Sequence, residues 1–89
     1  MRVLIIDDHA LFRVGLQGLL EQRGIEVIDA VAEGATGLQL IDELKPDIVL
    51  LDLRMPDMSG LEVLIEARKQ QIETPIVMLT TSNEERDLV

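Results

Sequence analysis

The sequence has 89 residues, of which 47% are hydrophobic and only one, a phenylalanine, is aromatic. A chain of this length can form one small core, and it lacks the aromatic platform on which single-stranded nucleic acids stack. Seventeen acidic and eight basic residues give a net charge of -9, which disfavours DNA or RNA as a direct partner and favours a cation or a basic protein surface. The absence of cysteine excludes disulfides and thiolate metal sites. No apolar run reaches the roughly 18 residues of a membrane span, so we expect a cytoplasmic protein without a membrane segment.

Two short apolar runs, each ended by acids, predict the first and third strands. Residues 3–6 are followed by Asp7 and Asp8, and residues 47–52 end in Asp52. Short β-branched runs of this kind are typical of strands that are buried on both faces of a parallel sheet. Between them we expect a helix over residues 10–23, ended by Gly24, then a less regular strand over residues 25–32. A second helix follows over residues 34–44 and stops before a proline.

The remaining sequence continues the alternation of strands and helices. Ser59 and Glu62 have the spacing of a capping box, which predicts a third helix that runs to about residue 71. Residues 76–79 form a fourth buried strand, and Ser82 with Glu85 predicts the start of a fourth helix. Strict alternation indicates a single α/β domain with a doubly wound parallel sheet and right-handed crossovers.

Polar side chains follow three of these strands directly. Asp7 and Asp8 come after the first strand, Asp52 ends the third, and Thr80 follows the fourth. Any one acid could simply end a strand in solvent or cap the next helix. Because ligands of open α/β sheets bind beyond the carboxyl ends of the strands, matched positions on three strands favour a shared site. Oxygen ligands without thiolates indicate Mg²⁺ as the bound ion.

The residues at the strand ends resemble the receiver domain of two-component response regulators. The resemblance rests on residues 3–9, on the acid-x-x-Met-Pro-x-x-x-Gly motif that begins at Asp52, and on residues 75–81. The run Asp-Asp-His followed by Ala-Leu-Phe-Arg-x-Gly-Leu is similar to the NarL/LuxR-type subfamily. The resemblance implies a flavodoxin-like fold with strand order 2-1-3-4-5 and Asp52 as the phosphoacceptor. It also implies a Mg²⁺ site made by Asp7, Asp8, Asp52 and the backbone carbonyl of Arg54, with Thr80 as the switch hydroxyl.

The same resemblance implies partners. The phosphoryl donor would be a sensor histidine kinase or a small phosphodonor such as acetyl phosphate, and water would later remove the phosphoryl group. Catalysis would then be shared with the donor, so the chain would not act as an enzyme in the usual sense. Members of the subfamily usually regulate transcription through a C-terminal helix-turn-helix domain, and contact with DNA would require that domain.

The resemblance covers the whole chain but not the whole pattern of the family. The family carries a further helix, strand and helix, and its last strand ends with a lysine that contacts the phosphoryl group. Lys45 and Lys69 are the only lysines, and neither follows a predicted strand. We therefore expect residues 1–89 to be the N-terminal portion of a receiver domain, truncated before the fifth strand, with an exposed fourth strand through which copies self-associate. The alternatives are a phosphorylation-independent assembly module and a metal-dependent phosphatase, but the phosphatase needs an acid where Arg54 stands.

Four further groups of residues invite an interpretation. His9 could be a metal ligand or a general base, but a role in starting the first helix is favoured. The Arg54 side chain could contact phosphate or an acid, or be solvated. Asp57, Glu62 and Glu66 are expected on a solvated face of the third helix. Met55, Met58 and Met78 are expected to pack in the core rather than to bind metal.

Overall fold

The computed structural model describes residues 1–79, which form four strands and three helices in strict alternation. The elements are β1 (Arg2–Ile6), α1 (Ala10–Gln22), β2 (Glu26–Val31), α2 (Gly34–Leu44), β3 (Ile48–Asp52), α3 (Gly60–Lys69) and β4 (Ile76–Leu79). Each element predicted within residues 1–79 is present, with ends that differ from the prediction by no more than two residues. The predicted fourth helix and Thr80 lie outside the described residues. Within residues 1–79, no helix is long and apolar enough to cross a membrane.

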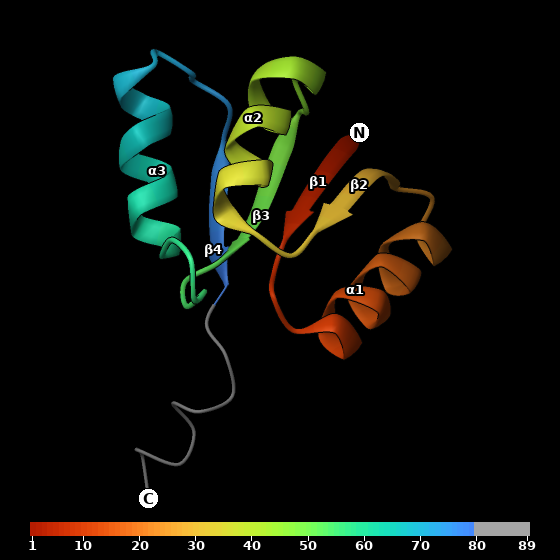
Figure 1. Ribbon diagram of the computed structural model, residues 1–89. Coiled ribbons are helices and arrows are strands. Elements are labelled where there is room, and N and C mark those ends of the chain that lie inside the picture. Colours follow the sequence, from red (N-terminus) through yellow and green to blue (C-terminus); the bar gives the residue numbers. More distant parts are fainter. Residues whose placement is uncertain (80–89) are drawn as a thin grey trace, which may run out of the picture.

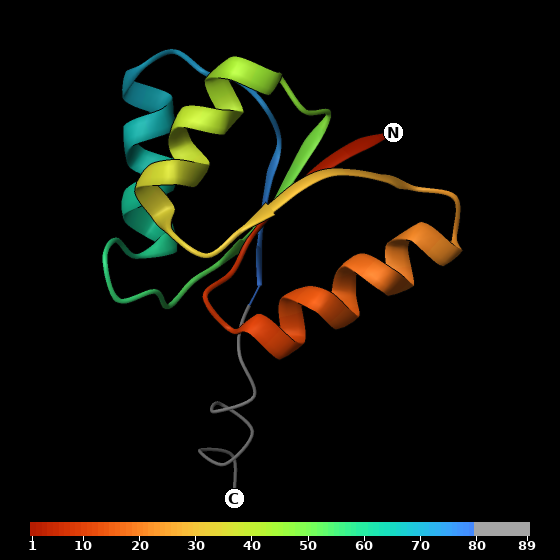
Figure 2. The ribbon, with the colours of Figure 1, turned by 45° about the vertical axis from the view of Figure 1, so that its right-hand side comes forward.

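The four strands form one parallel sheet in the order β2-β1-β3-β4, as predicted. β1 and β3 occupy the centre, and their apolar runs are largely buried because neighbouring strands flank both edges. The helices form two layers, with α2 and α3 on one side of the sheet and α1 on the other (Figures 1 and 2). Since all strands run in the same direction, their carboxyl ends lie at one edge of the sheet.

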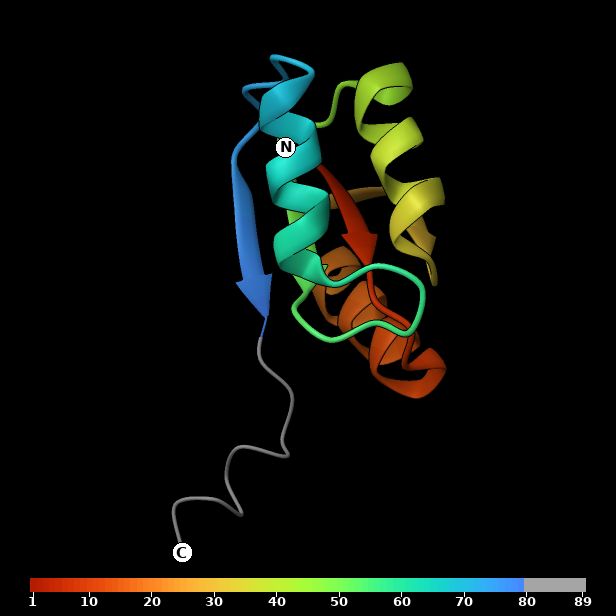
Figure 3. The same ribbon diagram turned by 60° about the vertical axis from the view of Figure 1, so that its left-hand side comes forward.

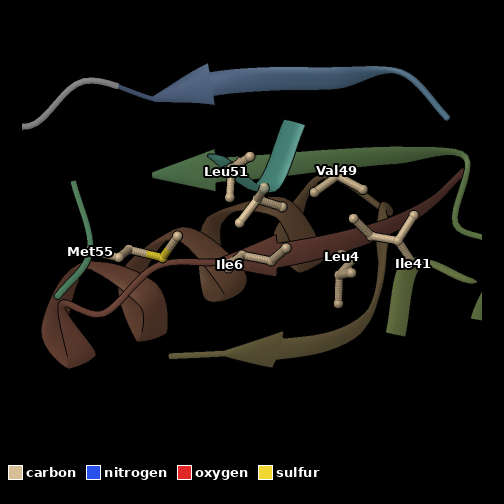
Figure 4. Packing of buried hydrophobic residues seen from close by; sticks show 7 residues of the cluster. Leu4, Ile6, Ile41, Val49, Leu51 and Met55 are labelled. Atoms are coloured by element: carbon tan, nitrogen blue, oxygen red, sulfur yellow. The ribbon is translucent and has the colours of Figure 1, made fainter. Parts of the chain in front are cut away.

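The best-packed layer lies between the sheet and the pair α2 and α3, which pack side by side (Figure 3). Its buried members come from β1, α2, β3, the loop after β3 and α3: Leu4, Ile6, Ile41, Val49, Leu51, Met55 and Val63 (Figure 4). Met58 and Met78 pack against this cluster, so the predicted packing role of the methionines is confirmed. The layer fixes where β1 and β3 end, and therefore where the acids that follow them lie.

The opposite face of the sheet is covered more thinly. No residue of α1 is buried, and Leu11, Phe12 and Val14 are 88%, 49% and 66% exposed. Val77 of β4 is also 44% exposed, and among the described residues β4 pairs only with β3. The two layers of the sandwich therefore contribute unequally to the core.

The ends of two helices show how local sequence determines the chain path. After α1, Gly24 has a φ of 79° and its N–H donates to the carbonyl of Glu21, while Ile25 donates to Leu20. This is a Schellman motif, as the glycine predicts. After α3 the same pair of bonds forms with Gln71, at a φ of 65°, in place of glycine. The helix therefore ends at Lys69, two residues before the predicted end. The prediction missed this end because no glycine marks the turn in the sequence.

Candidate metal centre

The carboxyl ends of β1 and β3 bring four side chains together. Asp7 and Asp8 follow β1, Asp52 is the last residue of β3, and His9 occupies the N-cap of α1. One ligand atom from each of these residues lies within 4.8 Å of the others. The convergence predicted for Asp7, Asp8 and Asp52 is thus present, and His9 joins the group. We call these four residues the acid cluster.

Two of the three carboxylates in the acid cluster are buried, and the cluster is incompletely hydrogen-bonded. The relative exposure of Asp7 is 1% and that of Asp52 is 0%. Asp7 Oδ1 accepts a 2.7 Å bond from the backbone N–H of His9, and Asp52 Oδ1 accepts a 3.2 Å bond from the backbone N–H of Arg54. In contrast, Asp8 Oδ1 and Asp52 Oδ2 are buried without a hydrogen-bond partner. Buried anionic oxygens need compensation, so these two atoms indicate a site that could hold a cation.

The electrostatics of the acid cluster agree with this conclusion. Burial raises the pKa of Asp52 above its ordinary value, and the carboxylates of Asp7 and Asp8 raise it further. The N–H of Arg54 works in the opposite direction and is outweighed. Each effect that raises the pKa disfavours the charged form, which is the form that binds a metal. A bound divalent cation would reverse that balance, because it neutralises the carboxylates directly.

His9 is at the start of α1, as favoured from the sequence, but its side chain does not cap the helix. Its ring Nδ1 lies 3.2 Å from Asp8 Oδ1, 3.4 Å from Asp7 Oδ1 and 3.6 Å from Asp52 Oδ2. The contact with Asp8 counts as an ion pair only when the imidazole is protonated, and it lacks the geometry of a hydrogen bond. The carboxylate of Asp8 is the main reason that the pKa of His9 is raised. Burial is the next-largest effect and lowers this pKa, while Asp7 and Asp52 raise it further.

Gly60 holds the loop after β3 against the end of that strand. Its N–H donates a 2.9 Å bond to the carbonyl of Leu53. A Cβ at this position would overlap the carbonyl oxygen of Asp52 and lie 2.9 Å from the Cα of Leu53. Both neighbours are backbone atoms, so neither can move aside easily. The glycine of the predicted motif is therefore required for the close approach of α3 to Asp52.

The predicted capping box of α3 is present, with Glu62 N–H bound to Ser59 Oγ and the Glu62 carboxylate bound to the N–H of Ser59. The expectation that Asp57 lies on a solvated face of α3 is wrong. Asp57 precedes the helix, and its two carboxylate oxygens accept 3.3 Å bonds from the N–H groups of Gly34 and Ala35. These donors belong to the first turn of α2, where an anion is favoured by the helix dipole. Asp57 therefore ties the loop after β3 to α2.

Two other predicted contributors have different outcomes. Thr80, the predicted switch hydroxyl, lies outside the described residues. Arg54 contacts the site through its backbone N–H, while the role of its carbonyl oxygen as a metal ligand stays a prediction. The sequence analysis did not predict one further contact, a 2.7 Å bond from the guanidinium of Arg13 to the backbone carbonyl of Asp7. Its spacing of one helical turn from His9 could have suggested it.

The donor set fits a hard divalent cation. Three carboxylates supply oxygen ligands, and two of their oxygens are buried and unpartnered. Mg²⁺ prefers oxygen ligands and retains several waters, so a few carboxylates at an open sheet edge suit it better than they suit a closed Ca²⁺ cage. The partial exposure of Asp8 leaves room for such waters. The residues that the sequence predicted as metal ligands are therefore compatible with Mg²⁺.

Comparisons with known proteins agree with the fold. The profile of the response regulator receiver domain family matches residues 3–89. The chain is 47% identical over 89 residues to the transcriptional regulatory protein YdfI of Bacillus subtilis, covering 99% of this chain and 41% of that protein. It thus spans about two fifths of the length of its curated relatives.

Two solved structures are close in shape. One is the signal receiver domain of the putative response regulator NarL from Mycobacterium tuberculosis, with a TM-score of 0.84 and 38% identity over 89% of this chain and 64% of that one. The other is the response regulator TrrA from Thermotoga maritima in complex with Mg²⁺ and BeF, with a TM-score of 0.83 and 36% identity over 98% of this chain and 76% of that one. The fold, the acid cluster and these matches together show that the chain belongs to the response regulator receiver domain family and is of the NarL/LuxR type.

Proposed function

We propose that this receiver domain accepts a phosphoryl group on Asp52 in a Mg²⁺-dependent reaction. The observation that carries the proposal is the carboxylate of Asp52, which is fully buried at the end of β3 and leaves Oδ2 unpartnered beside Asp7 and Asp8. A buried carboxylate without a compensating partner lowers stability, so its presence favours a functional role for Asp52. Asp7 and Asp8 would hold the metal together with Asp52 and the carbonyl of Arg54.

The chemistry follows from what each group can do. Bound Mg²⁺ would supply positive charge that offsets the carboxylates and the oxygens of the incoming phosphoryl group. An oxygen of Asp52 attacks the phosphorus, and the bond between phosphorus and the donor breaks, so that its electron pair leaves with acetate or with the imidazole of a phosphohistidine. The N–H of Arg54 holds the other oxygen of Asp52 and so orients the nucleophile. Later attack of water on the phosphorus would restore the carboxylate.

The neighbour TrrA supports the choice of ion, because it was solved with Mg²⁺ and BeF. We extend that pairing to this chain, which has the three carboxylates for the metal. Thr80 would provide the hydroxyl that responds to the phosphoryl group.

The proposal includes partners and place. The donor would be a sensor histidine kinase or a small phosphodonor, and the protein would act in the cytoplasm. The relative YdfI is a transcriptional regulatory protein, and the match to this chain covers 41% of its length. We therefore propose that phosphorylation controls a DNA-binding output domain, which alone would contact DNA.

The test is to incubate the purified chain with acetyl phosphate, with and without Mg²⁺, and to measure its intact mass. We expect one phosphoryl adduct that requires Mg²⁺ and is absent in Asp52→Asn. Asp42→Asn is the matched control, because Asp42 is an exposed acid on α2 and should leave labelling unchanged. An adduct that persists in Asp52→Asn, or that forms equally without Mg²⁺, would contradict the proposal.

A phosphorylation-independent assembly module is the second candidate, and the family match does not favour it. Its one supporting observation is β4, which pairs only with β3 among the described residues and exposes 44% of Val77. Open strands of this kind pair with other chains. Sedimentation of the parent and of Val77→Lys would test self-association through β4, since a lysine on an edge strand discourages pairing. Equal sedimentation of both as monomers would count against it.

A further inference from the structure

We infer that the acid cluster is also a site for Zn²⁺-like transition-metal ions, with His9 as a nitrogen ligand, and that such an ion excludes Mg²⁺. The inference rests on the proposed function, because it uses the same three carboxylates. It adds a regulatory property: an ion held by four side chains would occupy Asp52 and prevent it from accepting a phosphoryl group.

The first support is the position of the imidazole. Nδ1 of His9 lies 3.2, 3.4 and 3.6 Å from one oxygen each of Asp8, Asp7 and Asp52. In a tetrahedral site with ligand bonds of roughly 2.0 to 2.1 Å, the ligand atoms are about 3.3 Å apart. The three distances from Nδ1 are close to that spacing, and all four ligand atoms lie within 4.8 Å of one another, so a contraction of the oxygen-to-oxygen distances would bring them around one ion.

The second support is the unpartnered oxygen of Asp52. This residue has a relative exposure of 0%, and its Oδ2 has no hydrogen-bond partner although it is 3.6 Å from the His9 ring. Asp8 Oδ1, the nearest oxygen to the ring, is equally without a hydrogen bond. Both atoms therefore lie where a cation bound by His9 would contact them.

Ligand chemistry separates the two ions. Mg²⁺ binds oxygen ligands in an octahedral arrangement and gains little from an imidazole, so it would leave His9 uncoordinated. Zn²⁺ readily accepts imidazole nitrogen together with carboxylate oxygen and forms four-coordinate sites that, when closed, leave no open position. The same pocket would thus respond differently to each ion, and His9 would be the residue that distinguishes them.

The test uses the fact that His9 is the only histidine of the chain, provided that no histidine tag remains. The ¹⁵N resonances of its imidazole are recorded with Zn²⁺ and with Mg²⁺, and calorimetry gives the Kd of each ion for the parent, His9→Gln and Asp52→Asn. We expect Zn²⁺ to shift the Nδ1 resonance while Mg²⁺ does not. His9→Gln should weaken Zn²⁺ binding at least tenfold and change Mg²⁺ binding less than twofold, and Asp52→Asn should weaken both.

Each outcome has one meaning. Unchanged imidazole resonances at saturating Zn²⁺, or equal Zn²⁺ affinity in His9→Gln, would overturn this inference. If Mg²⁺ still binds and Asp52 is still labelled in that case, the proposed function stands and only the inference fails. If neither ion binds the parent chain, both fail. Retained Mg²⁺ binding in His9→Gln also verifies that the variant is folded, as expected for a ring that is 57% exposed.

Discussion

Two regions of the molecule contain fully buried side chains whose burial has opposite energetic consequences. Beneath α2 and α3, side chains such as Leu4 and Val63 have relative exposures of 0%, and their burial removes apolar surface from water. At the ends of β1 and β3, Asp7 and Asp52 are just as inaccessible, but there burial removes water from carboxylates that repel one another. We call the first region the α2–α3 layer. The α2–α3 layer stabilises the fold, and the repulsion within the acid cluster offsets part of that stabilisation.

The comparison shows why the site occurs where it does. The acids follow directly from the buried strands β1 and β3, so the apolar contacts of these strands hold the carboxylates together against their repulsion. Two unit charges at a separation of 4 to 5 Å repel by roughly 3 to 4 kcal/mol at an effective dielectric near 20. A cation would turn this repulsion into attraction, so the region that is unfavourable without an ion is ready to bind one.

The largest expected effect is in the α2–α3 layer. Leu51→Ala should lower the free energy of unfolding by about 3 kcal/mol, because it removes a fully buried side chain and leaves a cavity. Leu11→Ala is the matched control, since Leu11 is 88% exposed on α1 and should change stability by less than about 0.5 kcal/mol. Urea unfolding followed by circular dichroism measures both. Similar losses for the two leucines would remove the distinction between the layers.

The next effect concerns the acid cluster with its ion. At a free Mg²⁺ concentration near 100 times Kd, binding to the folded state should add about 2.7 kcal/mol to the free energy of unfolding. Urea titrations with Mg²⁺, and with NaCl at the same ionic strength, separate specific binding from screening. Equal stabilisation by the two salts would mean that the carboxylates do not form a metal site.

A smaller effect of opposite sign to Leu51→Ala is expected without metal. Asp52→Asn should raise the free energy of unfolding at pH 7 by about 1 kcal/mol, because it removes one buried charge from beside Asp7 and Asp8. The amide oxygen can still accept the bond from the N–H of Arg54. Asp42→Asn, on the exposed side of α2, serves as the control. A less stable Asp52→Asn would show that the carboxylate is favourably placed even without an ion.

Much of this arrangement could be predicted from the sequence because it depends on local patterns. Short apolar runs ended by acids identified β1 and β3, and parallel strands necessarily bring Asp7, Asp8 and Asp52 to one edge of the sheet. The capping box at Ser59 identified the start of α3 for the same reason, since both partners lie within three residues.

Interactions between distant segments were less accessible. His9 precedes a helix, and only the fold shows that its ring lies beside Asp52, which is 43 positions later in the chain. Asp57 looked like a surface residue because its donors, Gly34 and Ala35, are more than 20 residues earlier. The turn at Gln71 was missed because a glutamine rarely has a positive φ and carries no signal for it.

The smallest expected effect concerns Asp57, which contrasts with the acid cluster because its position stabilises the charged carboxylate. Burial alone would raise the pKa of Asp57, but bonds from the N–H groups of Gly34 and Ala35, with those of Asp57 itself and Met58, lower it below the ordinary value of 3.8. The ionised form therefore stabilises the fold above that pH, and the contribution is lost as the pH falls through the lower folded value. Since Asp57 is exposed, Asp57→Asn should cost only a few tenths of a kcal/mol at pH 7.

The difference between the parent and Asp57→Asn should shrink as the pH falls below 4, since both carry a neutral side chain once Asp57 is protonated. Urea midpoints between pH 2.5 and 7 would measure this, provided that the fold persists in acid. A difference independent of pH would mean that shape rather than charge ties the loop to α2. Asp57 lies five residues after Asp52 but accepts hydrogen bonds from backbone N–H groups instead of contacting other acids. The two aspartates thus differ both in burial and in partners, and the two together decide whether a carboxylate stabilises this fold by itself or is suited to bind an ion.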